Sequence, residues 1–576
     1  MKSYLKFPQR STATALVILG IMGVVALMSI REDSVTMDES PHIVSGYSYL
    51  KFQDMRLNPE HPPLVKDLAA IPLLFQKINF PLDHPAWSSM VNAQWDLGPQ
   101  FLYRSGNDPD KIIFWGRIGP ILLMLLFGWF VFKWARELFG AKWGLFTLSL
   151  FAFSPTIMAH GRLVTTDVPA AFAFFAAIYY YLKFLKNPSK KNLLIAGVVF
   201  AIAQLLKFSL VLLLGFLPTI TVFWILLHLK SVNIFRRDVI KTTVLWGARF
   251  FAILAITALL ILPVYQFHVS NYPPEKQAQD IRHILQDGKF PALTDALVWM
   301  SDKPLLRAYA QYLLGVSMVF MRVAGGNTTY FLGEVSNQAW WYYFPVAFFF
   351  KVPGAILVFI ALSVILLLKR TFSMAILQKN FVEVAMLLFV IFYWVISITG
   401  NLNIGVRHVL PTFPFIYLLI AGQMKRWLFQ DTKNAGRAIF IAVLLVWYIG
   451  LSIGIYPHYI AYFNEFAGGP ANGYKYVVDS NLDWGQDLRR LKKFVEEKNI
   501  DRIKVDYFGG GDVKYYLGER AEIWHADNGE TTGWLAVSAT FLQTSRAYPR
   551  ASYEWLDKYA PVKKIGFSMF VYNIEN

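Results

Sequence analysis

Long apolar runs recur along this chain, and they constrain its fold more than any other feature. A helix crosses the hydrocarbon core of a bilayer in about 20 residues, and the apolar runs approach that length. They lie near 13–30, 112–132, 143–159, 167–182, 193–207, 209–228, 243–264, 341–368, 381–399, 408–424 and 438–456. With 55% hydrophobic and 16% charged residues, the 576-residue chain does not suit one soluble domain. We predict a mainly α, polytopic membrane bundle of about 11 to 13 spans.

Basic residues indicate how this bundle is oriented. Lys and Arg gather in alternate loops, which marks those loops as cytoplasmic under the positive-inside rule. The basic loops lie within 133–142, 183–191, 230–241, 369–379 and 425–437. Because the net charge of +17 falls largely in such loops, no nucleic-acid binding is predicted. Residues 1–30 are interpreted as a retained first helix, since no small-x-small cleavage pattern precedes Arg31.

An odd number of spans that starts inside places two long loops, 31–111 and 265–340, and the tail on the outer face. We therefore predict a transmembrane domain, 1–456, that includes both loops. A small extracytoplasmic α/β domain, 457–576, follows it. Within the first loop, the apolar patch Leu68–Phe75 predicts helix lying on the membrane surface.

The tail alternates between helical and β patterns. An amphipathic stretch, Leu488–Lys498, precedes several short β-rich runs. These runs are Ile503–Phe508, Trp534–Ser538 and Lys564–Val571. Gly509-Gly510-Gly511 lacks the GxGxxG spacing of a nucleotide site, so a flexible turn is predicted there.

The first outer loop concentrates acidic residues beside histidines. It opens with Asp38-Glu39-Ser40-Pro41-His42 and continues to Asn58-Pro59-Glu60-His61-Pro62-Pro63. Sugar transfer needs a base for the acceptor's proton, cations or a metal for the departing phosphate, and a pocket with little water. These carboxylates and histidines supply that inventory. An N-cap role for Asp38, before a helix that starts at Ser40-Pro41, is an alternative that is compatible with catalysis by its neighbours.

Two further outer segments carry charge at the membrane surface. Arg162 and Asp167 bracket a short loop where an unpaired charge is costly, and a salt bridge between them is the alternative to ligand binding. Arg407-His408 opens the tenth run, where a cation favours an anionic partner such as a phosphate or a lipid headgroup. Lys351 is a weaker member of this set, because snorkelling explains it as well. The chain has no cysteine, which excludes disulfides and thiol nucleophiles.

Several of these segments resemble the GT-C superfamily of integral-membrane glycosyltransferases. The segments are Met37-Asp38-Glu39, Pro59-Glu60-His61-Pro62-Pro63-Leu64, His160-Gly161-Arg162 with Asp167, Leu332-Gly333-Glu334-Val335-Ser336, Trp340-Trp341-Tyr342-Tyr343-Phe344-Pro345, Tyr462-Phe463-Asn464-Glu465, and Asp479-Ser480-Asn481-Leu482-Asp483-Trp484-Gly485-Gln486-Asp487. More closely, the chain looks like the bacterial glycosyltransferase family 39 group, which is related to protein O-mannosyltransferases and to the lipid A aminoarabinose transferase. The resemblance covers essentially the whole chain.

This resemblance implies an inverting reaction on the outer face with a polyprenyl-phosphate sugar as donor. It implies that Asp38 is the general base or orients the acceptor, and that Glu60 and Asp167 share its pocket. Glu39, beside Asp38, is the fourth catalytic candidate. In some relatives the residue that matches Glu60 binds a divalent metal, so Glu60 and His61 are the metal candidates.

The chain departs from the family pattern at the donor phosphate. Several relatives have an arginine two residues after the position of Glu39, where this chain has Pro41, and a lysine where it has His61. Phosphate binding is therefore expected from other residues. The candidates are His42, His61, Arg162, Lys351, Arg407 and His408. A neutral imidazole at His61 suits a metal and a protonated one suits phosphate, which leaves metal dependence open.

We predict a glycosyltransferase of the bacterial cytoplasmic membrane, with its active site and C-terminus on the extracytoplasmic face. Its partners would be the lipid-linked donor, membrane lipid, and an acceptor that is a protein, a lipid or a glycan. The alternative is a transporter or flippase of lipid-linked sugars. Transporters usually place ionisable residues at mid-membrane and have repeated halves, whereas here the acids cluster in loops at one surface.

Overall fold

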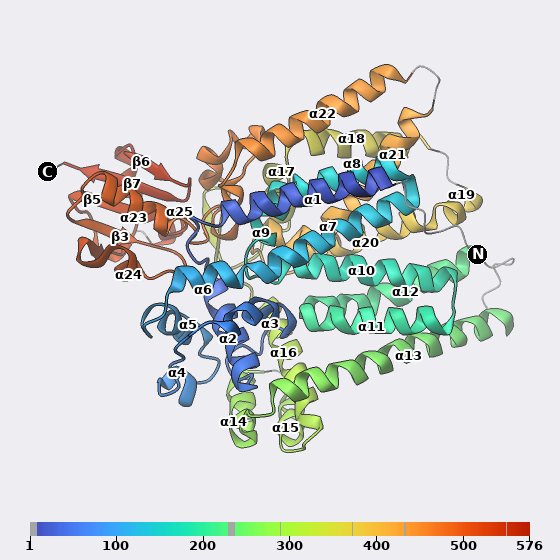
Figure 1. Ribbon diagram of the computed structural model, residues 1–576, viewed down its shortest axis with the longest axis horizontal. Coiled ribbons are helices and arrows are strands. Elements are labelled where there is room, and N and C mark those ends of the chain that lie inside the picture. The colour runs from blue at the N-terminus through green and yellow to red at the C-terminus, as the bar shows by residue number, and fades with distance from the viewer. Residues whose placement is uncertain are drawn as a thin grey trace.

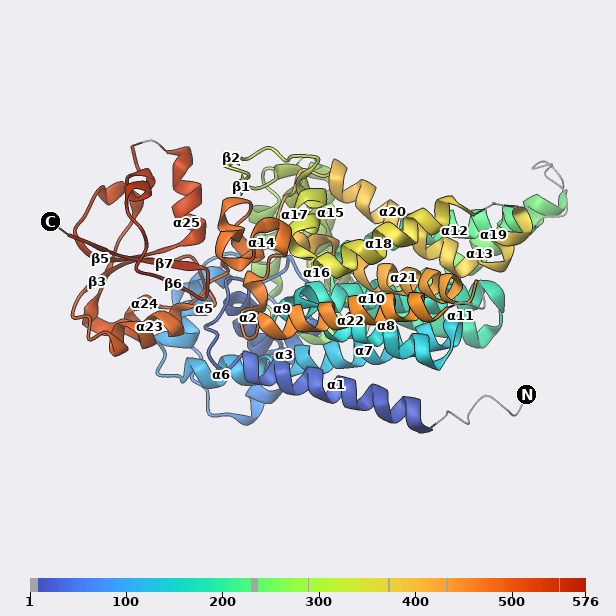
Figure 2. The same ribbon diagram turned by 90° about the horizontal axis from the view of Figure 1, so that it is seen from above.

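The computed structural model describes residues 9–228, 237–288, 290–370, 373–430, 434–548 and 550–575. Long helices lie along one another, and the sheet of the C-terminal region lies beyond one end of them (Figure 1). The view turned by 90° shows the same arrangement, with α1 (Gln9–Ser29) running along the other helices (Figure 2). Parts of three predicted cytoplasmic loops, 229–236, 371–372 and 431–433, lie outside the described residues.

Each predicted apolar run is helical in the structure. The helices are α1 (Gln9–Ser29), α6 (Pro109–Gly116) with α7 (Ile118–Phe139), α8 (Ala141–Ala152) with α9 (Pro155–Gly161), α10 (Asp167–Lys186), α11 (Lys190–Leu206), η2 (Phe208–Leu212) with α12 (Leu213–His228), α13 (Arg237–His268), α17 (Tyr343–Lys351) with α18 (Gly354–Leu368), α20 (Phe381–Thr399), η3 (Val406–Thr412) with α21 (Phe413–Leu428), and α22 (Ala435–Gly454).

Not all of these helices are long enough to cross a membrane alone. Within the described ranges, seven are long and apolar enough, and an eighth span is counted if α17 and α18, bent by 118°, form one. The runs at α8–α9, α11 and α21 consist of shorter or broken helices. The chain is an integral membrane protein with the predicted type of helical bundle, and the shorter helices account for the difference from the expected count.

Breaks between helices follow local chemistry. Pro155 occupies the first turn of α9, where its missing N–H is tolerated, and the Ser154 hydroxyl caps this helix by accepting from the Ile157 N–H. Lys207 interrupts α11 and α12 with an extended backbone. This break forms a tight turn between the two apolar runs and leaves the Lys207 side chain at the same end of the bundle as Asp167.

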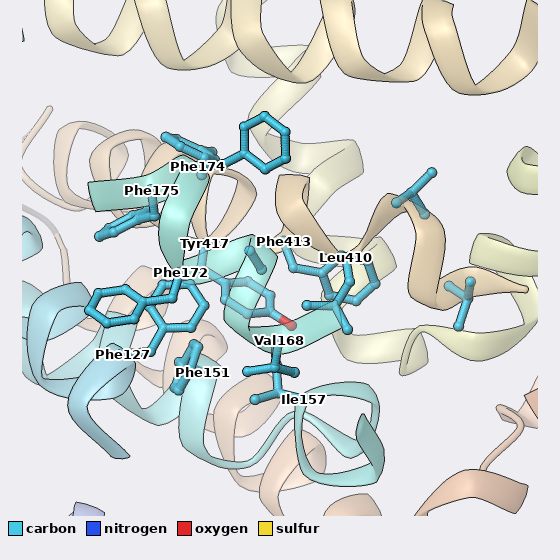
Figure 3. Packing of buried hydrophobic residues seen from close by; sticks show 14 of the residues in the cluster. Phe127, Phe151, Ile157, Val168, Phe172, Phe174, Phe175, Leu410, Phe413 and Tyr417 are labelled. Carbon is cyan, nitrogen blue, oxygen red and sulfur yellow. The ribbon is translucent and has the colours of Figure 1, made fainter. Parts of the chain in front are cut away.

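An aromatic core packs around α10, the most buried of the candidate spans. The ring of Phe127 on α7 lies 4.9 Å from that of Phe151 and 5.1 Å from that of Phe172 (Figure 3). Helices in a membrane gain little from the hydrophobic effect between them, so their association depends on such packing. Because α10 is packed on all sides, it is a rigid support for Asp167 at its first turn.

The two outer loops are largely helical. The first loop contains α2 (Glu39–Phe52), α3 (Leu64–Ala70), η1 (Ile71–Phe75), α4 (Pro85–Ser88) and α5 (Gln94–Tyr103). The second contains α14 (Pro274–Ile284), α15 (Pro291–Ser301), α16 (Leu306–Gly325) and a hairpin of β1 (Thr329–Phe331) and β2 (Glu334–Ser336). The predicted helix over Leu68–Phe75 is present as the end of α3 and η1, and Phe75 at its end is 87% exposed.

The C-terminal region contains a five-stranded sheet in the order β4-β3-β5-β7-β6. Its elements are α23 (Leu488–Glu497), β3 (Ile503–Asp506), α24 (Val513–Leu517), β4 (Ala521–Ile523), β5 (Gly533–Ser538), α25 (Ala539–Thr544), β6 (Lys563–Ile565) and β7 (Met569–Ile574). Strand β3 pairs in parallel with β4 and β5, whereas β7 is antiparallel to β5 and β6. The predicted helix and the first two β-rich runs are confirmed, and the third run, Lys564–Val571, covers the turn between the antiparallel strands β6 and β7.

The run Gly509-Gly510-Gly511 lies in the loop between β3 and α24, as predicted. Its glycines serve close packing in addition to the turn. A Cβ on Gly510 would lie 2.7 Å from the Thr36 carbonyl oxygen. The tail backbone therefore lies directly against the segment that precedes Asp38.

We expect Gly46→Ala to destabilise the first outer loop, because a Cβ at this position of α2 would lie 2.7 Å from the Lys66 carbonyl carbon on α3. Overpacking of this kind costs about 1–3 kcal/mol, which thermal unfolding of the detergent-solubilised protein would measure. Gly20→Ala on α1 is the matched control, since nothing lies within 4 Å of its Cβ position. Equal stability of the two variants would contradict this packing.

Candidate active site

A chain of ion pairs at the end of the bundle next to the C-terminal region joins residues that are far apart in the sequence. Arg407 Nη1 donates to Asp38 Oδ2 at 2.7 Å and to Asp167 Oδ2 at 3.3 Å. The other oxygen of Asp167 accepts from Lys207 Nζ at 2.7 Å. Two carboxylates and two cations thus form one connected cluster, which we call the Arg407 cluster.

Each member of the Arg407 cluster sits at the end of a helical element. Asp38 is the residue before α2, and its side chain makes no capping hydrogen bond, so the N-cap alternative is not realised. Asp167 opens α10, where the helix dipole favours a negative charge. Arg407 lies in η3, which follows Gly405. The φ of Gly405 is 99°, which is unfavourable for other residues, and a Cβ added there would lie 2.8 Å from Ser480 Oγ.

The tail completes this cluster. Arg407 Nε donates to Ser480 Oγ at 3.1 Å, and its guanidinium carbon lies 4.3 Å from the ring centroid of Trp484. The charges of Arg407 and Asp38 act on Asp479. The backbone of Asp479 has a left-handed φ of 54°, which is uncommon for residues other than glycine. Burial raises the pKa of Asp479 to about 6, although Arg407 opposes this rise. A third carboxylate that can change its charge near neutral pH is therefore available here.

Glu39 follows Asp38 in the chain, but its environment differs from that of Asp38. It is fully buried, and its oxygens accept from Arg117 Nε at 2.8 Å and Arg117 Nη2 at 2.6 Å. The backbone N–H groups of Thr36 and Val164 also donate to it, each at 2.9 Å. Since both oxygens are occupied and buried, this geometry gives Glu39 a positioning role and keeps it from meeting a substrate.

Glu60 and the two predicted histidines line the neighbouring part of the first loop. Burial raises the pKa of Glu60, and the nearby Asp38 charge adds to the rise. His42 and His61 pack edge to face with centroids 5.3 Å apart, and burial lowers the pKa of both rings. His42 is fixed through its Nδ1 to the Val164 carbonyl at 2.8 Å. Neutral imidazoles at these positions offer polar contacts but no positive charge to a phosphate.

A metal site at Glu60 and His61 finds no support in the geometry. Within the part of the chain that the structure describes, no three His, Asp or Glu side chains come together as metal ligands. His61 Nδ1 is buried without a hydrogen-bond partner, which fits one donor atom but not a complete ligand set. We therefore derive no reaction step that passes through a metal.

Two predicted phosphate ligands are engaged elsewhere. Arg162 pairs with Asp33 at 2.8 Å and not with Asp167, so the alternative of an Arg162–Asp167 bridge is wrong. Lys351 neither snorkels nor faces the cluster, because its ammonium donates to the carbonyls of Ile460, Tyr462 and Asn481 at 2.6–2.8 Å. These two buried cations tie the tail and the first outer segment to the bundle.

His408, the remaining phosphate candidate, stacks on the ring of Phe344 with centroids 5.3 Å apart. Three charged residues near the cluster are not among the predicted site residues. Lys207 lies between two apolar runs, and a lysine at that position was a usable signal. The other two are Asp479 and Arg322. The charge of Arg322 acts on both Glu60 and Asp479. The sequence around Asp479 and Arg322 has no pattern that places these residues near the first loop.

An apolar cavity of about 650 Å³ lies between α17, α18, α20 and α21. Its lining residues Phe348 and Trp394 connect it to the element that carries Arg407. The Phe348 ring lies 5.4 Å from that of Phe413, and Trp394 Nε1 donates to Thr412 Oγ1 at 3.3 Å. The cavity therefore extends to the end of α21 at which η3 precedes it.

Comparison with known proteins agrees with this architecture. Residues 111–263 match the family model for dolichyl-phosphate-mannose-protein mannosyltransferase. The Saccharomyces cerevisiae protein O-mannosyltransferase Pmt1-Pmt2 complex bound to the sugar donor matches with a TM-score of 0.55 at 10% identity, over 79% of this chain and 90% of that chain. ArnT from Cupriavidus metallidurans bound to undecaprenyl phosphate matches with a TM-score of 0.46 at 11% identity, over 97% and 98% of the two chains.

The comparison with curated protein sequences gives no match. The family model and the shared fold confirm the resemblance to the GT-C glycosyltransferases that the sequence motifs indicated.

We expect Glu39→Gln to destabilise the protein by about 3–5 kcal/mol, because it leaves the buried Arg117 charge without its partner. Arg104→Gln is the control: it breaks a pair with Asp512 in which Arg104 is 64% exposed, and such pairs contribute under about 1 kcal/mol. Denaturant unfolding in detergent would measure both. A loss from Glu39→Gln no larger than the loss from Arg104→Gln would refute the structural role.

A second prediction concerns pH. Burial raises the pKa of Asp483 to about 8, and its Oδ1 has no partner among the described residues. A carboxyl whose folded pKa is raised adds stability below its unfolded pKa, near 4, and loses it as pH rises through about 8. Between pH 6 and 8, above the titration of Asp479, we expect the melting temperature of the wild type to fall more than that of Asp483→Asn.

The exposed Asp501→Asn is the control for this experiment and should keep the wild-type pH dependence. If Asp483→Asn shows the same fall in melting temperature between pH 6 and 8 as Asp501→Asn, the proposed titration of Asp483 is wrong.

Proposed function

We propose that this protein is an inverting glycosyltransferase that moves a sugar from a polyprenyl-phosphate donor to an acceptor on the outer face of the membrane. The observation that carries this proposal is the Arg407 cluster at the outer end of an apolar cavity. The match of residues 111–263 to a mannosyltransferase family model supports the reaction class. The yeast complex with the shared fold, which is bound to a sugar donor, supports the kind of substrate.

The apolar cavity suits the lipid part of such a donor. It lies among helices that face the bilayer, and it ends near the η3 segment that carries Arg407. A polyprenyl tail in this cavity would place its phosphate near Arg407 and Lys207. Binding of the tail would then hold the sugar at the reaction site, so that transfer depends mainly on orientation.

Asp38 is the carboxylate best placed to act as general base. Its side chain is 27% exposed, whereas that of Asp167 is 5% exposed and bound by two cations. Asp38 would take the proton from the acceptor as the acceptor attacks the anomeric carbon. The bond from that carbon to the phosphate oxygen breaks, and its electron pair leaves with the polyprenyl phosphate. Attack from the face opposite the phosphate gives inversion.

Arg407 and Lys207 would stabilise the charge that develops on the departing phosphate. Arg407 pairs with Asp38 and Asp167, and Lys207 pairs with Asp167. An incoming phosphate would share Arg407 with these carboxylates and thereby couple donor binding to the orientation of Asp38. Asp167 fixes both cations, which makes it a positioning residue in this scheme.

The proposed orientation places the tail and both outer loops outside the cytoplasm. The C-terminal sheet and the helices of the first outer loop lie at one end of the bundle (Figure 2). This placement supports a transmembrane domain over 1–456 and an extracytoplasmic domain over 457–576 in a bacterial cytoplasmic membrane. A flippase of lipid-linked sugars would need no proton acceptor at the outer surface, and only the enzyme would consume donor in detergent.

We expect Asp38→Asn to lower turnover by about 10²–10⁴-fold, the usual contribution of a general base, while donor binding is retained or strengthened because Arg407 is released. The mass spectra of glycolipids and glycoproteins from cells that carry the wild type or the variant would reveal the product whichever sugar is transferred. Consumption of polyprenyl-phosphate sugars by the purified protein would then give the rate.

The control is Asp83→Asn, an exposed aspartate in the same outer loop. It should leave the glycans and the rate unchanged. Wild-type glycans in cells that carry only Asp38→Asn would exclude Asp38 as the base.

A further inference from the structure

A second, polar cavity of about 350 Å³ lies in the C-terminal region. Its walls come from the β1–β2 hairpin, from η6 (Pro470–Lys475), from α25 and from strands β6 and β7. The volume falls at the lower end of the range for small-ligand sites, about 300–1,000 Å³. No residue of the Arg407 cluster lines it, so the reaction site does not account for it.

Hydrogen bonds between these elements hold the walls of the cavity in place. Tyr330 Oη of the hairpin donates to the Lys475 carbonyl at 3.0 Å. Gln543 Nε2 of α25 donates to the Tyr474 carbonyl at 3.0 Å. The rings of Tyr474 and Phe570 pack edge to face with centroids 4.7 Å apart. A ligand would therefore meet a site that is largely formed before it binds.

The cavity offers hydrogen-bonding groups that the protein does not use. The hydroxyl groups of Tyr474, Tyr559 and Tyr572 line it and have no hydrogen-bond partner within the described ranges of the chain. Tyr572 is only 5% exposed, yet it lines the cavity. A phenolic hydroxyl can both donate and accept, and ring faces offer an apolar surface beside it. Sugars present the same combination of hydroxyl groups and apolar C–H faces.

The charge of the cavity is positive. Arg546 is neutralised by Asp557, which accepts two hydrogen bonds at 2.6 and 3.1 Å. Lys475 and Lys564 also line the cavity, and neither forms an ion pair with a described carboxylate. Lys564 Nζ lies 4.6 Å from the Tyr474 ring centroid and donates to the Ala471 carbonyl at 2.9 Å. Burial and the Lys475 charge lower the pKa of Lys564, as expected for two like charges that lack an anion.

We propose that this cavity binds an acidic saccharide. Its carboxylate or phosphate would lie between Lys475 and Lys564, and its ring would pack against Tyr474 and Phe570. The hydroxyl of Tyr572 would bind a sugar hydroxyl. A neutral sugar would leave the two ammonium groups unpaired, and an acidic peptide would not use the aromatic faces and the hydroxyl groups together.

Two segments link this cavity to the Arg407 cluster. Tyr474 and Lys475 precede Asp479 by a few residues, and Thr540 Oγ1, which accepts from the Asp479 N–H at 3.2 Å, lies one helical turn from Gln543 in the cavity wall. The cavity is thus placed to hold the distal part of an acceptor whose near end reaches Asp38. This acceptor role rests on the proposed transferase function, whereas saccharide binding does not.

Titration calorimetry of the full-length protein in detergent, without donor, tests the proposal. The probes are digalacturonate, glucose 6-phosphate and neutral maltose. We expect at least one acidic probe to bind about tenfold or more tightly than maltose, and its binding to weaken with salt. Preference for digalacturonate or for glucose 6-phosphate identifies a carboxylate or a phosphate as the anionic group.

Variants assign the binding to this cavity. Lys475→Gln and Lys564→Gln should each weaken the acidic probe about tenfold, the value of one charge-assisted hydrogen bond. Tyr572→Phe, which removes only a hydroxyl, should weaken it several-fold. Lys563→Gln is the matched control, because Lys563 is exposed and its neighbour Lys564 points the opposite way along β6. Unchanged melting temperatures confirm that the variants are folded.

Asp38→Asn should bind the probe as the wild type does, which separates failure of transfer from failure of this site. The proposal is overturned if maltose binds as tightly as the acidic probes or if none of the three binds. It is also overturned if Lys563→Gln weakens binding as much as Lys564→Gln, or if tetra-aspartate binds as tightly as the saccharides.

Discussion

The contacts of the Arg407 guanidinium hold the candidate active site together. The guanidinium joins Asp38 of the first loop, Asp167 of the bundle core and Ser480 of the tail, and it stacks on Trp484. A planar group with five donors can satisfy several partners in fixed directions, which a lysine cannot do. Three parts of the chain that are far apart in the sequence are thereby brought into one geometry.

Support for this geometry comes from buried charges beneath it. Arg117 holds Glu39, Arg162 holds Asp33, and Lys351 binds three carbonyls of the tail. Removing one partner of such a pair costs more stability than the intact pair contributes, because the remaining charge stays buried without a partner. These interactions therefore favour one arrangement of loop, bundle and tail, in which Asp38 is the more exposed of the two carboxylates that pair with Arg407.

The sequence predicted the helices well, because apolar runs and basic loops reflect physical constraints that act locally along the chain. It also identified Asp38, Asp167 and Arg407 separately, and the structure brings them into contact. It did not distinguish Arg162 and Lys351, which point into the protein, from Arg407. A positive charge at or within an apolar run does not indicate which way the side chain points, and only the fold determines which of the three lies beside Asp38 and Asp167.

For a related reason, Lys207 and Asp479 were not predicted to lie in the site. Lys207 pairs with Asp167 although α10 and α11 separate them in the sequence. Asp479 lies near the cluster because the tail packs against the first loop, where Gly510 contacts Thr36. Such contacts between distant segments leave no periodic pattern in a single sequence. The same holds for the polar cavity of the C-terminal region. Its two lysines, Lys475 and Lys564, are separated in the sequence by most of the elements of that region.

A cryo-electron microscopy map of the protein in nanodiscs with an added polyprenyl phosphate tests the central claim most directly. We expect the phosphate within hydrogen-bonding distance of Arg407 or Lys207, and the prenyl chain in the cavity between α17, α18, α20 and α21. A phosphate bound at the opposite end of the bundle, or at the outer end but out of reach of both cations, would contradict the account.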